Sequence, residues 1–214
     1  MGYLNEKMWG ILEQKTKDED AKLQVDVRVG KEYLTAVEKI CDYGVDRAKT
    51  IRDTFPTFTL HDETHICNVI RLMENLLGDK IEQLSRDEVA ILIMSACCHD
   101  IGMSYKEEEK EEILEDADRI NQYLDKNHGE YIKAYADGRE EPVLTNEMIS
   151  RYLRTIHHER IEELLYKIEW PDALRGKVDR DDLIRVCVSH GNNIGELDNM
   201  EPTAGVDLRF CACD

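Results

Sequence analysis

The stretch "ILIMSACCHDIGMSY", residues 91–105, decides the fold. It opens with apolar and small residues and then runs directly into His99 and Asp100. A helix that is apolar nearly all round is typical of the centre of a domain. An uncompensated charge buried there costs several kcal/mol unless it is paired or bound to metal. A bound cation would explain why such a helix ends in an imidazole and a carboxylate side by side.

The residues around this stretch predict where the helix begins and ends. Ser85 is a favourable N-terminal cap, and Asp87 and Glu88 place negative charge in the first turn. Gly102 is well placed to end the helix. We therefore expect a central buried helix over 86–100.

Most of the remaining chain shows helical periodicity. No comparable run alternates with period two, and three of the four prolines, Pro56, Pro142 and Pro171, fall where one helix should stop and another begin. Apolar residues recur at helical spacing, for example Tyr33, Leu34, Val37, Ile40, Cys41, Val45, Ala48 and Ile51. The predicted class is an all-α single bundle with helices at about 3–18, 31–54, 62–77, 86–100, 107–126, 144–156, 158–168 and 180–190.

One segment is a charge run. Residues 106–118, "KEEEKEEILEDAD", have Ile113 and Leu114 as their main apolar contacts, a pattern typical of a solvated helix. A lid over a site is the alternative interpretation.

Composition limits the classes of partner. The chain has 214 residues and a formal net charge of −18, so its surface must be strongly acidic. Such a field repels nucleic acid and anionic membrane, and any phosphate-bearing ligand would need a locally positive site supplied by metal or by Arg and Lys. The first 20 residues do not resemble a secretion signal, and no apolar stretch approaches the length of a membrane span. These features predict a cytoplasmic protein without a membrane partner.

The seven cysteines are odd in number and lie mostly in apolar runs, which favours reduced core thiols over a disulfide framework. Cys211 and Cys213 form a lone C-x-C, a weak zinc signal that we interpret as thiols near a chain end.

The seven histidines carry the strongest functional signal. His61 and His65 in "LHDETH" are four residues apart and can share one helix face. Since His99 and Asp100 are about 100° apart on an ideal helix, they can reach one cation only where the helix ends.

Further histidines follow this pattern. His157 and His158 stand together in "RTIHHERI", and His190 ends an apolar run before Gly191, as His99 does before Gly102. A lone histidine at a helix C-terminus is usually a cap that interacts with the helix dipole, and His128 is interpreted in that way. The conjunction with the buried His-Asp pair is what favours a metal site.

The ordered series "FTLHDETHICNVI", "CCHDIG", the histidine pair near 157 and "VCVSHG" resembles the HD-domain superfamily of metal-dependent phosphohydrolases, which includes cyclic nucleotide phosphodiesterases. The resemblance spans residues 55–214, and residues 1–54 are then an N-terminal helical extension packed on that core within one structural domain. It is closest to HD domains at the N-terminus of larger bacterial proteins, some joined to Hsp90-like ATPases, so C-terminal domains of a longer chain are expected partners.

The resemblance implies roles for individual residues. His65 is similar to the first metal ligand of the family, and His99 and Asp100 to the pair that names it, with Asp100 bridging two cations in a binuclear version. His157 corresponds to the next histidine, with His158 as the competing choice, and His190 to the last one.

Two further roles come from the same resemblance. His61 is similar to the histidine that protonates the leaving oxygen. The family closes its site with a late aspartate, whereas this chain ends in "VDLRFCACD", with Asp214 as its last residue and Asp207 seven residues earlier. We favour a natural protein that continues beyond Asp214 over Asp214 as the closing ligand, in which case this fragment would have a weakened site and could be inactive.

The resemblance implies hydrolysis of a phosphomonoester or phosphodiester bond, in a nucleotide or related phosphate ester, by a metal-activated water. One or two divalent ions, Mn, Fe, Co, Ni, Zn or Mg, suit the donors. Arg154 and Arg160 are the candidate phosphate-binding residues, among nearby cations that also include Arg47, Lys49, Arg52 and Arg151. The alternative is a degenerate HD domain that senses a ligand or serves as a scaffold. Nucleic acid is disfavoured by charge, and a homodimer stays open.

Overall fold

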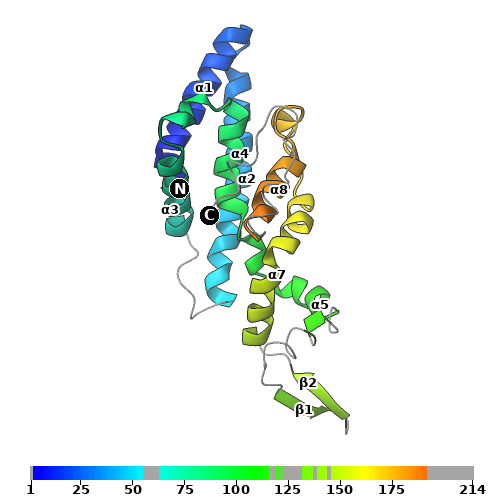
Figure 1. Cartoon of the computed structure of the whole chain (residues 1–214). Coiled ribbons are helices and arrows are strands. Elements are labelled where there is room, and N and C mark those ends of the chain that lie inside the picture. Colours follow the sequence, from blue (N-terminus) through cyan, green and yellow to red (C-terminus); the bar gives the residue numbers. More distant parts are fainter. Residues whose placement is uncertain are drawn as a thin grey trace.

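The structure, a computed structural model, is a bundle of α-helices with one small two-stranded hairpin (Figure 1). It describes residues 2–54, 63–115, 119–120, 122, 132–136, 139–143 and 146–191. The predicted all-α class is confirmed. Among the described residues, no helix is long and apolar enough to cross a membrane.

The elements follow one another along the chain with short 3-10 turns between several of the helices. The α-helices are α1 (Lys7–Leu23), α2 (Val27–Thr54), α3 (Glu63–Leu77), α4 (Arg86–Cys98), α5 (Glu107–Glu115), α7 (Asn146–Tyr166) and α8 (Arg180–Ser189). The 3-10 turns are η1 (Gly2–Asn5), η2 (Gly78–Gln83), η3 (Ile101–Met103) and η4 (Asp172–Leu174). The strands β1 (Ile132–Ala136) and β2 (Arg139–Val143) pair antiparallel, with Ile132 opposite Val143.

Helix α4 is the centre of the bundle, as predicted. All its residues from Val89 to Cys98 are buried, and it packs against α1, α2, α3 and α8. Its start follows the predicted cap: the Ser85 hydroxyl accepts the Glu88 backbone N–H, and the Glu88 carboxylate accepts the Ser85 N–H. The last helical residue is Cys98, which leaves His99 and Asp100 at the C-terminal end.

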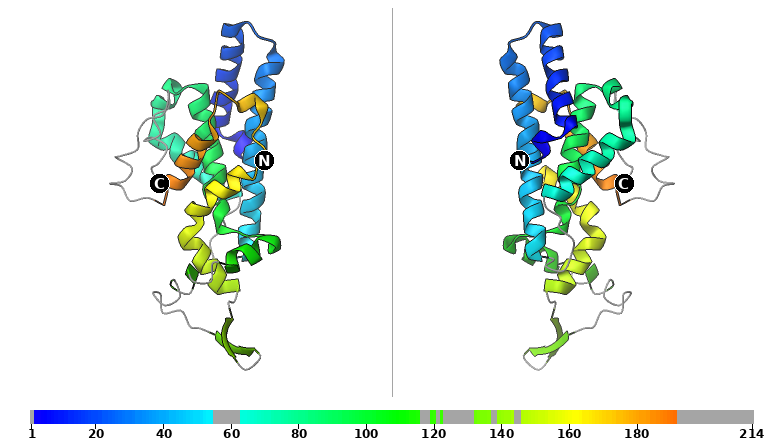
Figure 2. Two further views of the ribbon diagram at one scale, coloured as in Figure 1. Left: turned by 90° about the vertical axis from the view of Figure 1, so that its right-hand side faces the viewer. Right: turned by 90° about the vertical axis from the view of Figure 1, so that its left-hand side faces the viewer.

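Two features differ from the sequence predictions. The helices expected at 144–156 and 158–168 are one continuous helix, α7, because no glycine or proline interrupts residues 146–166. The β1–β2 hairpin was not predicted, and it lies at the end of the molecule opposite the turn between α1 and α2 (Figures 1 and 2).

Helices α2 and α4 approach each other closely at Gly44. A Cβ atom at Gly44 would lie 2.2 Å from the carbonyl oxygen of Cys97, much less than a van der Waals contact, and this neighbour is backbone that cannot rotate away. Gly44 therefore sets how closely α2 and α4 pack at Cys97, which is two residues before His99.

We expect Gly44→Ala to lower the free energy of unfolding by about 1–3 kcal/mol, since overpacking a core forces backbone shifts of this cost. The matched control is Gly10→Ala in α1, where a Cβ would meet nothing within 4 Å. That change should raise stability by up to about 1 kcal/mol, because alanine is the better helix former. Thermal unfolding of both variants measures the contrast, and equal effects would contradict the packing argument.

Candidate metal centre

Four helices bring five of the predicted residues to one place. His65 lies on α3, His157 lies in the middle of α7, and the other three residues follow the ends of helices: His99 and Asp100 after α4, and His190 after α8. These positions are far apart in the sequence and meet only because α3, α7 and α8 surround the end of α4.

The first half of the centre contains His65, His99 and Asp100, whose ligand atoms lie within 4.8 Å of one another. The two Nε2 atoms are 3.3 Å apart. The Asp100 Oδ2 atom lies 2.9 Å from His99 Nε2 and 3.4 Å from His65 Nε2. Three donor atoms thus converge on one point.

The second half contains Asp100, His157 and His190, which meet the same criterion. Here the other carboxylate oxygen, Oδ1, faces His157 Nε2 at 3.8 Å. The Nε2 atoms of His157 and His190 are 2.6 Å apart. Asp100 is therefore the one residue shared by both halves, with one oxygen turned toward each.

Backbone contacts fix the ring orientation of three of these histidines. The Nδ1 atoms of His99 and His157 contact the carbonyl oxygens of Ala96 and Arg154, at 3.0 and 2.7 Å. The Nδ1 of His190 contacts the carbonyl of Cys187 in the same way. Because a carbonyl oxygen can only accept, Nδ1 carries a proton, and in the neutral imidazole the Nε2 lone pair then faces inward.

The ionisation states of the centre favour a cation. Burial alone would raise the pKa of Asp100, but the electrostatic influence of His99, followed by the contact with His65, holds that pKa well below its ordinary value. Burial and the neighbouring His190 lower the pKa of His157 to about 4. At neutral pH the centre therefore combines an ionised carboxylate with a neutral imidazole at His157.

The facing lone pairs test whether a metal fits. Two unprotonated Nε2 atoms at 2.6 Å, as in His157 and His190, repel each other unless a proton or a cation lies between them. The 3.3 Å between His65 and His99 equals the edge of a tetrahedral site, about 3.3 Å for metal–nitrogen bonds of about 2.0–2.1 Å. The His157–His190 pair would need to open by less than about 1 Å. The donor set thus suits a divalent ion.

The turn η3 places the Asp100 carboxylate. The Met103 N–H donates to the Asp100 carbonyl at 2.9 Å, which folds the chain back directly after the His-Asp pair. A Cβ at Gly102 would lie 2.0 Å from the His157 carbonyl oxygen, so only glycine permits η3 to pack this closely against α7. The sequence predicted that Gly102 would end the central helix. In the structure the helix ends at Cys98, and Gly102 instead brings His157 next to Asp100.

Comparison with known proteins identifies the family of this chain. Residues 55–213 match the family model HD-CE, about three quarters of the chain. The chain belongs to the HD-CE family. No curated protein and no solved structure matches it. The predicted HD-type domain is thereby confirmed, whereas the fusion to an Hsp90-like ATPase and the two-part division at residue 54 stay predictions.

In this HD-CE chain the geometry favours His157 over the adjacent His158 as a metal ligand. His157 points at Asp100 and His190, whereas His158 contributes no atom to either donor group among the described residues. The His158 ring lies against Gly191 and edge-on to His157, with 5.7 Å between the ring centroids.

Other predicted residues lie elsewhere or outside the described ranges. Arg154 is exposed on α7, and Lys49 is exposed beside Asp46, with 2.8 Å between Nζ and Oδ1. The proposed phosphate contacts of Arg154 and Arg160 stay predictions. His61, Asp207 and Asp214 lie outside the described residues.

Sequence reasoning missed Glu109. It was placed in a solvated charge run, yet its side chain is only 15% exposed and forms an ion pair with the buried Arg47. Arg47 was expected among the cations near the phosphate, and its helical position beside Val45 and Ala48 could have indicated its burial.

We expect His157→Ala to weaken divalent-metal binding by more than about 100-fold, because outer contacts alone contribute about 10- to 100-fold and His157 supplies a donor atom. His158→Ala is the matched control and should retain wild-type affinity. Isothermal titration with Zn²⁺ or Mn²⁺ measures both constants. Loss of metal in the His158 variant with retention in the His157 variant would reverse the assignment.

Proposed function

We propose that this HD-CE domain is a metal-dependent phosphohydrolase. The observation that carries the proposal is the position of Asp100, which turns one carboxylate oxygen toward His65 and His99 and the other toward His157 and His190. A carboxylate shared in this way supports a pair of cations at neighbouring positions, and two-ion sites are suited to displacement at phosphorus.

The donor set narrows the metals that would be held. Neutral imidazoles together with a carboxylate suit Mn, Fe, Co, Ni or Zn, and sites richer in oxygen also take Mg. His65, His99 and Asp100 would hold one ion, and Asp100, His157 and His190 would hold a second. Divalent ions at such a centre lower the pKa of water and neutralise phosphoryl oxygens, which is the chemistry of phosphate ester hydrolysis.

The protein supplies the arrangement that this chemistry requires. The carbonyl contacts at Nδ1 hold the rings of His99, His157 and His190 with Nε2 directed inward. The side chains of His99 and Asp100 are each only 14% exposed, so little water competes for their donor atoms. His65 is more open, at 34%, and the substrate is expected to approach from its side.

The net negative charge of the chain disfavours binding of an anionic substrate anywhere except at a metal-loaded centre. With a net charge of −18, most of the surface repels phosphate esters, and bound cations would provide the local exception. Nucleotides are our proposed substrate class among these esters.

We expect the wild-type chain loaded with Mn²⁺ or Zn²⁺ to hydrolyse p-nitrophenyl phosphate or bis(p-nitrophenyl) phosphate. The His99→Ala, Asp100→Ala double variant should lose at least about 100-fold in rate, which is equivalent to about 2.7 kcal/mol of transition-state stabilisation. Comparison of the two esters distinguishes monoesterase from diesterase activity. Elemental mass spectrometry on the same samples reports metal content.

The isosteric variant Asp100→Asn separates loss of charge from loss of fold, which circular dichroism checks. A wild-type protein that binds metal but hydrolyses neither these esters nor a panel of nucleotides would favour the alternative, a non-catalytic HD domain that senses a ligand or serves as a scaffold. A double variant with wild-type metal content would remove the ligand assignment.

We expect His61→Ala to leave metal content unchanged and to slow hydrolysis by about 10²- to 10⁴-fold, the usual contribution of a general acid. An ester with a leaving group that needs no proton, such as p-nitrophenolate, should be affected less than an alkyl ester. Steady-state rates on both substrates test this role, and loss of metal in the variant would make His61 a ligand instead.

A further inference from the structure

Arg47 on α2 reaches the turn that follows Asp100. Its side chain is only 5% exposed. The Nε atom donates to the Ile101 carbonyl at 3.2 Å and Nη2 donates to the Ser104 carbonyl at 3.0 Å. The Ser104 hydroxyl in turn donates to the Arg47 carbonyl at 3.4 Å.

Arg160 on α7 reaches the same turn from the other side. Its Nη1 atom donates to the carbonyls of Gly102 and Ser104, at 2.5 and 2.9 Å. Together the two guanidinium groups satisfy the carbonyls of Ile101, Gly102 and Ser104, which have no helical partner to accept from. The peptide segment that follows Asp100 is thus held by side chains from two different helices.

Glu109 on α5 joins the two arginines. Arg47 donates to both of its carboxylate oxygens, at 2.8 and 2.9 Å, and Arg160 donates to Oε2 at 3.2 Å. Burial acts to raise the pKa of Glu109, but the hydrogen bonds and charge of Arg47 outweigh it and lower that pKa to about 2. The carboxylate stays ionised and offsets two partly buried like charges that would otherwise repel each other.

These contacts connect an acidic helix to the metal centre. We name Arg47, Glu109 and Arg160 the arginine clamp. We propose that the arginine clamp is a positioning device that holds η3 so that Asp100 faces both groups of histidines, and that α5, through Glu109, thereby sets the metal affinity of the centre. This inference rests on the metal-dependent function proposed above.

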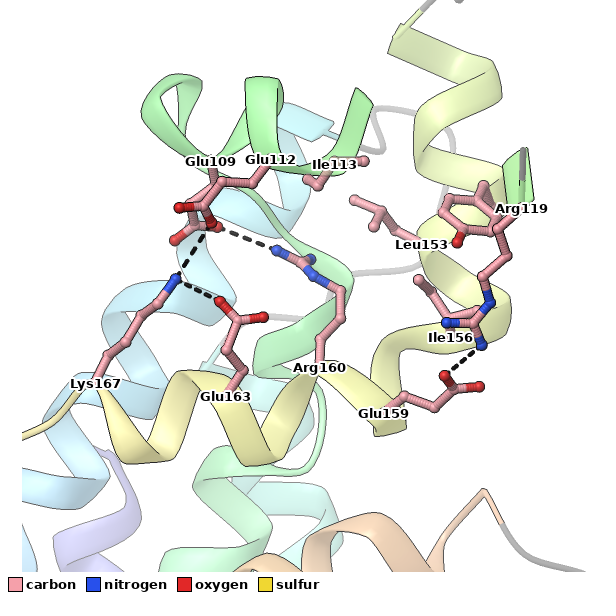
Figure 3. A pocket seen from close by; sticks show the side chains of 11 residues that line it. Glu109, Glu112, Ile113, Arg119, Leu153, Ile156, Glu159, Arg160, Glu163 and Lys167 are labelled. Carbon is pink, nitrogen blue, oxygen red and sulfur yellow. Dashed lines mark hydrogen bonds and ion pairs between the residues drawn. The ribbon is translucent and has the colours of Figure 1, made fainter. Parts of the chain in front are cut away.

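The surroundings of Glu109 show which other polar contacts link α5 to α7. Figure 3 shows Glu109 and Arg160 reaching toward each other across the space between α5 and α7, beside a cavity of about 240 Å³. The neighbouring pairs made by Lys167 with Glu112 and Glu163 are about half exposed, so they contribute little to the position of α5. The buried polar part of the connection is the arginine clamp, and Ile113 of α5 adds a buried apolar contact with Tyr152 and Leu153 of α7.

The test compares Glu109→Gln with Glu108→Gln, a matched change at an exposed neighbour on the same helix. Co²⁺ is titrated into each metal-free protein, and its visible absorption reports both affinity and coordination geometry. Glu109→Gln should weaken Co²⁺ binding by about 10- to 100-fold, the usual cost of losing an outer contact that orients ligands. Glu108→Gln should bind as the wild type does.

Two further variants distinguish positioning from simple stability. Glu109→Asp keeps the charge and should restore part of the affinity. Arg160→Lys keeps a positive charge but loses the fork that reaches two carbonyls, so it should weaken Co²⁺ binding even when the protein stays folded. Circular dichroism at the titration temperature confirms that each variant is folded. Wild-type Co²⁺ affinity and spectrum in folded Glu109→Gln and Arg160→Lys would overturn the proposal.

A metal-independent measurement keeps this result separate from the proposed function. The imidazole nitrogen shifts of His99 and His157 in the metal-free protein report tautomer and ring environment by NMR. The arginine clamp predicts that these shifts change in Glu109→Gln and not in Glu108→Gln. Absence of Co²⁺ binding by the wild type would reject the metal-dependent function, and unchanged histidine shifts would reject the arginine clamp.

Discussion

Asp100 is an ionised carboxylate with only 14% of its side chain exposed, and its charge must be balanced locally. None of the groups that balance it is adjacent in the sequence except His99. The bundle has to bring imidazoles from α3, α7 and α8 to the end of α4, and it has to satisfy the backbone that turns away from the carboxylate. Much of the architecture beyond the apolar core meets this one requirement.

The core and the polar centre are coupled through backbone contacts. Gly44 allows α2 to lie against the Cys97 carbonyl, and Gly102 allows η3 to lie against the His157 carbonyl. Both close approaches occur within a few residues of His99 and Asp100. The side-chain carboxylate and imidazoles are therefore placed by main-chain packing. Packed backbone moves less easily than a side chain changes rotamer. This explains how a mostly helical scaffold can bring donor atoms from four helices to one place.

Local sequence patterns predicted the central helix, its Ser85 cap and the ordered histidines, because periodicity and capping are properties of neighbouring residues. The pairing of Arg47 with Glu109 spans 62 residues, and no local pattern distinguishes Glu109 from Glu108 beside it. The β1–β2 hairpin was missed for a related reason: Pro142 and three charged residues leave β2 without an alternating apolar pattern. The break expected near His157 had no glycine or proline to cause it. Sequence order favoured His157 but kept His158 as a competing choice, and only the rotation of α7 separates the two.

The centre would also couple metal binding to folding. His65 and His99 are separated by 34 positions, and His157 and His190 by 33, with Asp100 between the two pairs. A site built from residues this far apart exists only in the folded chain, so an ion bound there would stabilise the folded state relative to the unfolded one. Metal binding and the free energy of folding would then be thermodynamically coupled. The supply of metal in the cell would in that case govern how long the folded chain persists as well as what it can catalyse.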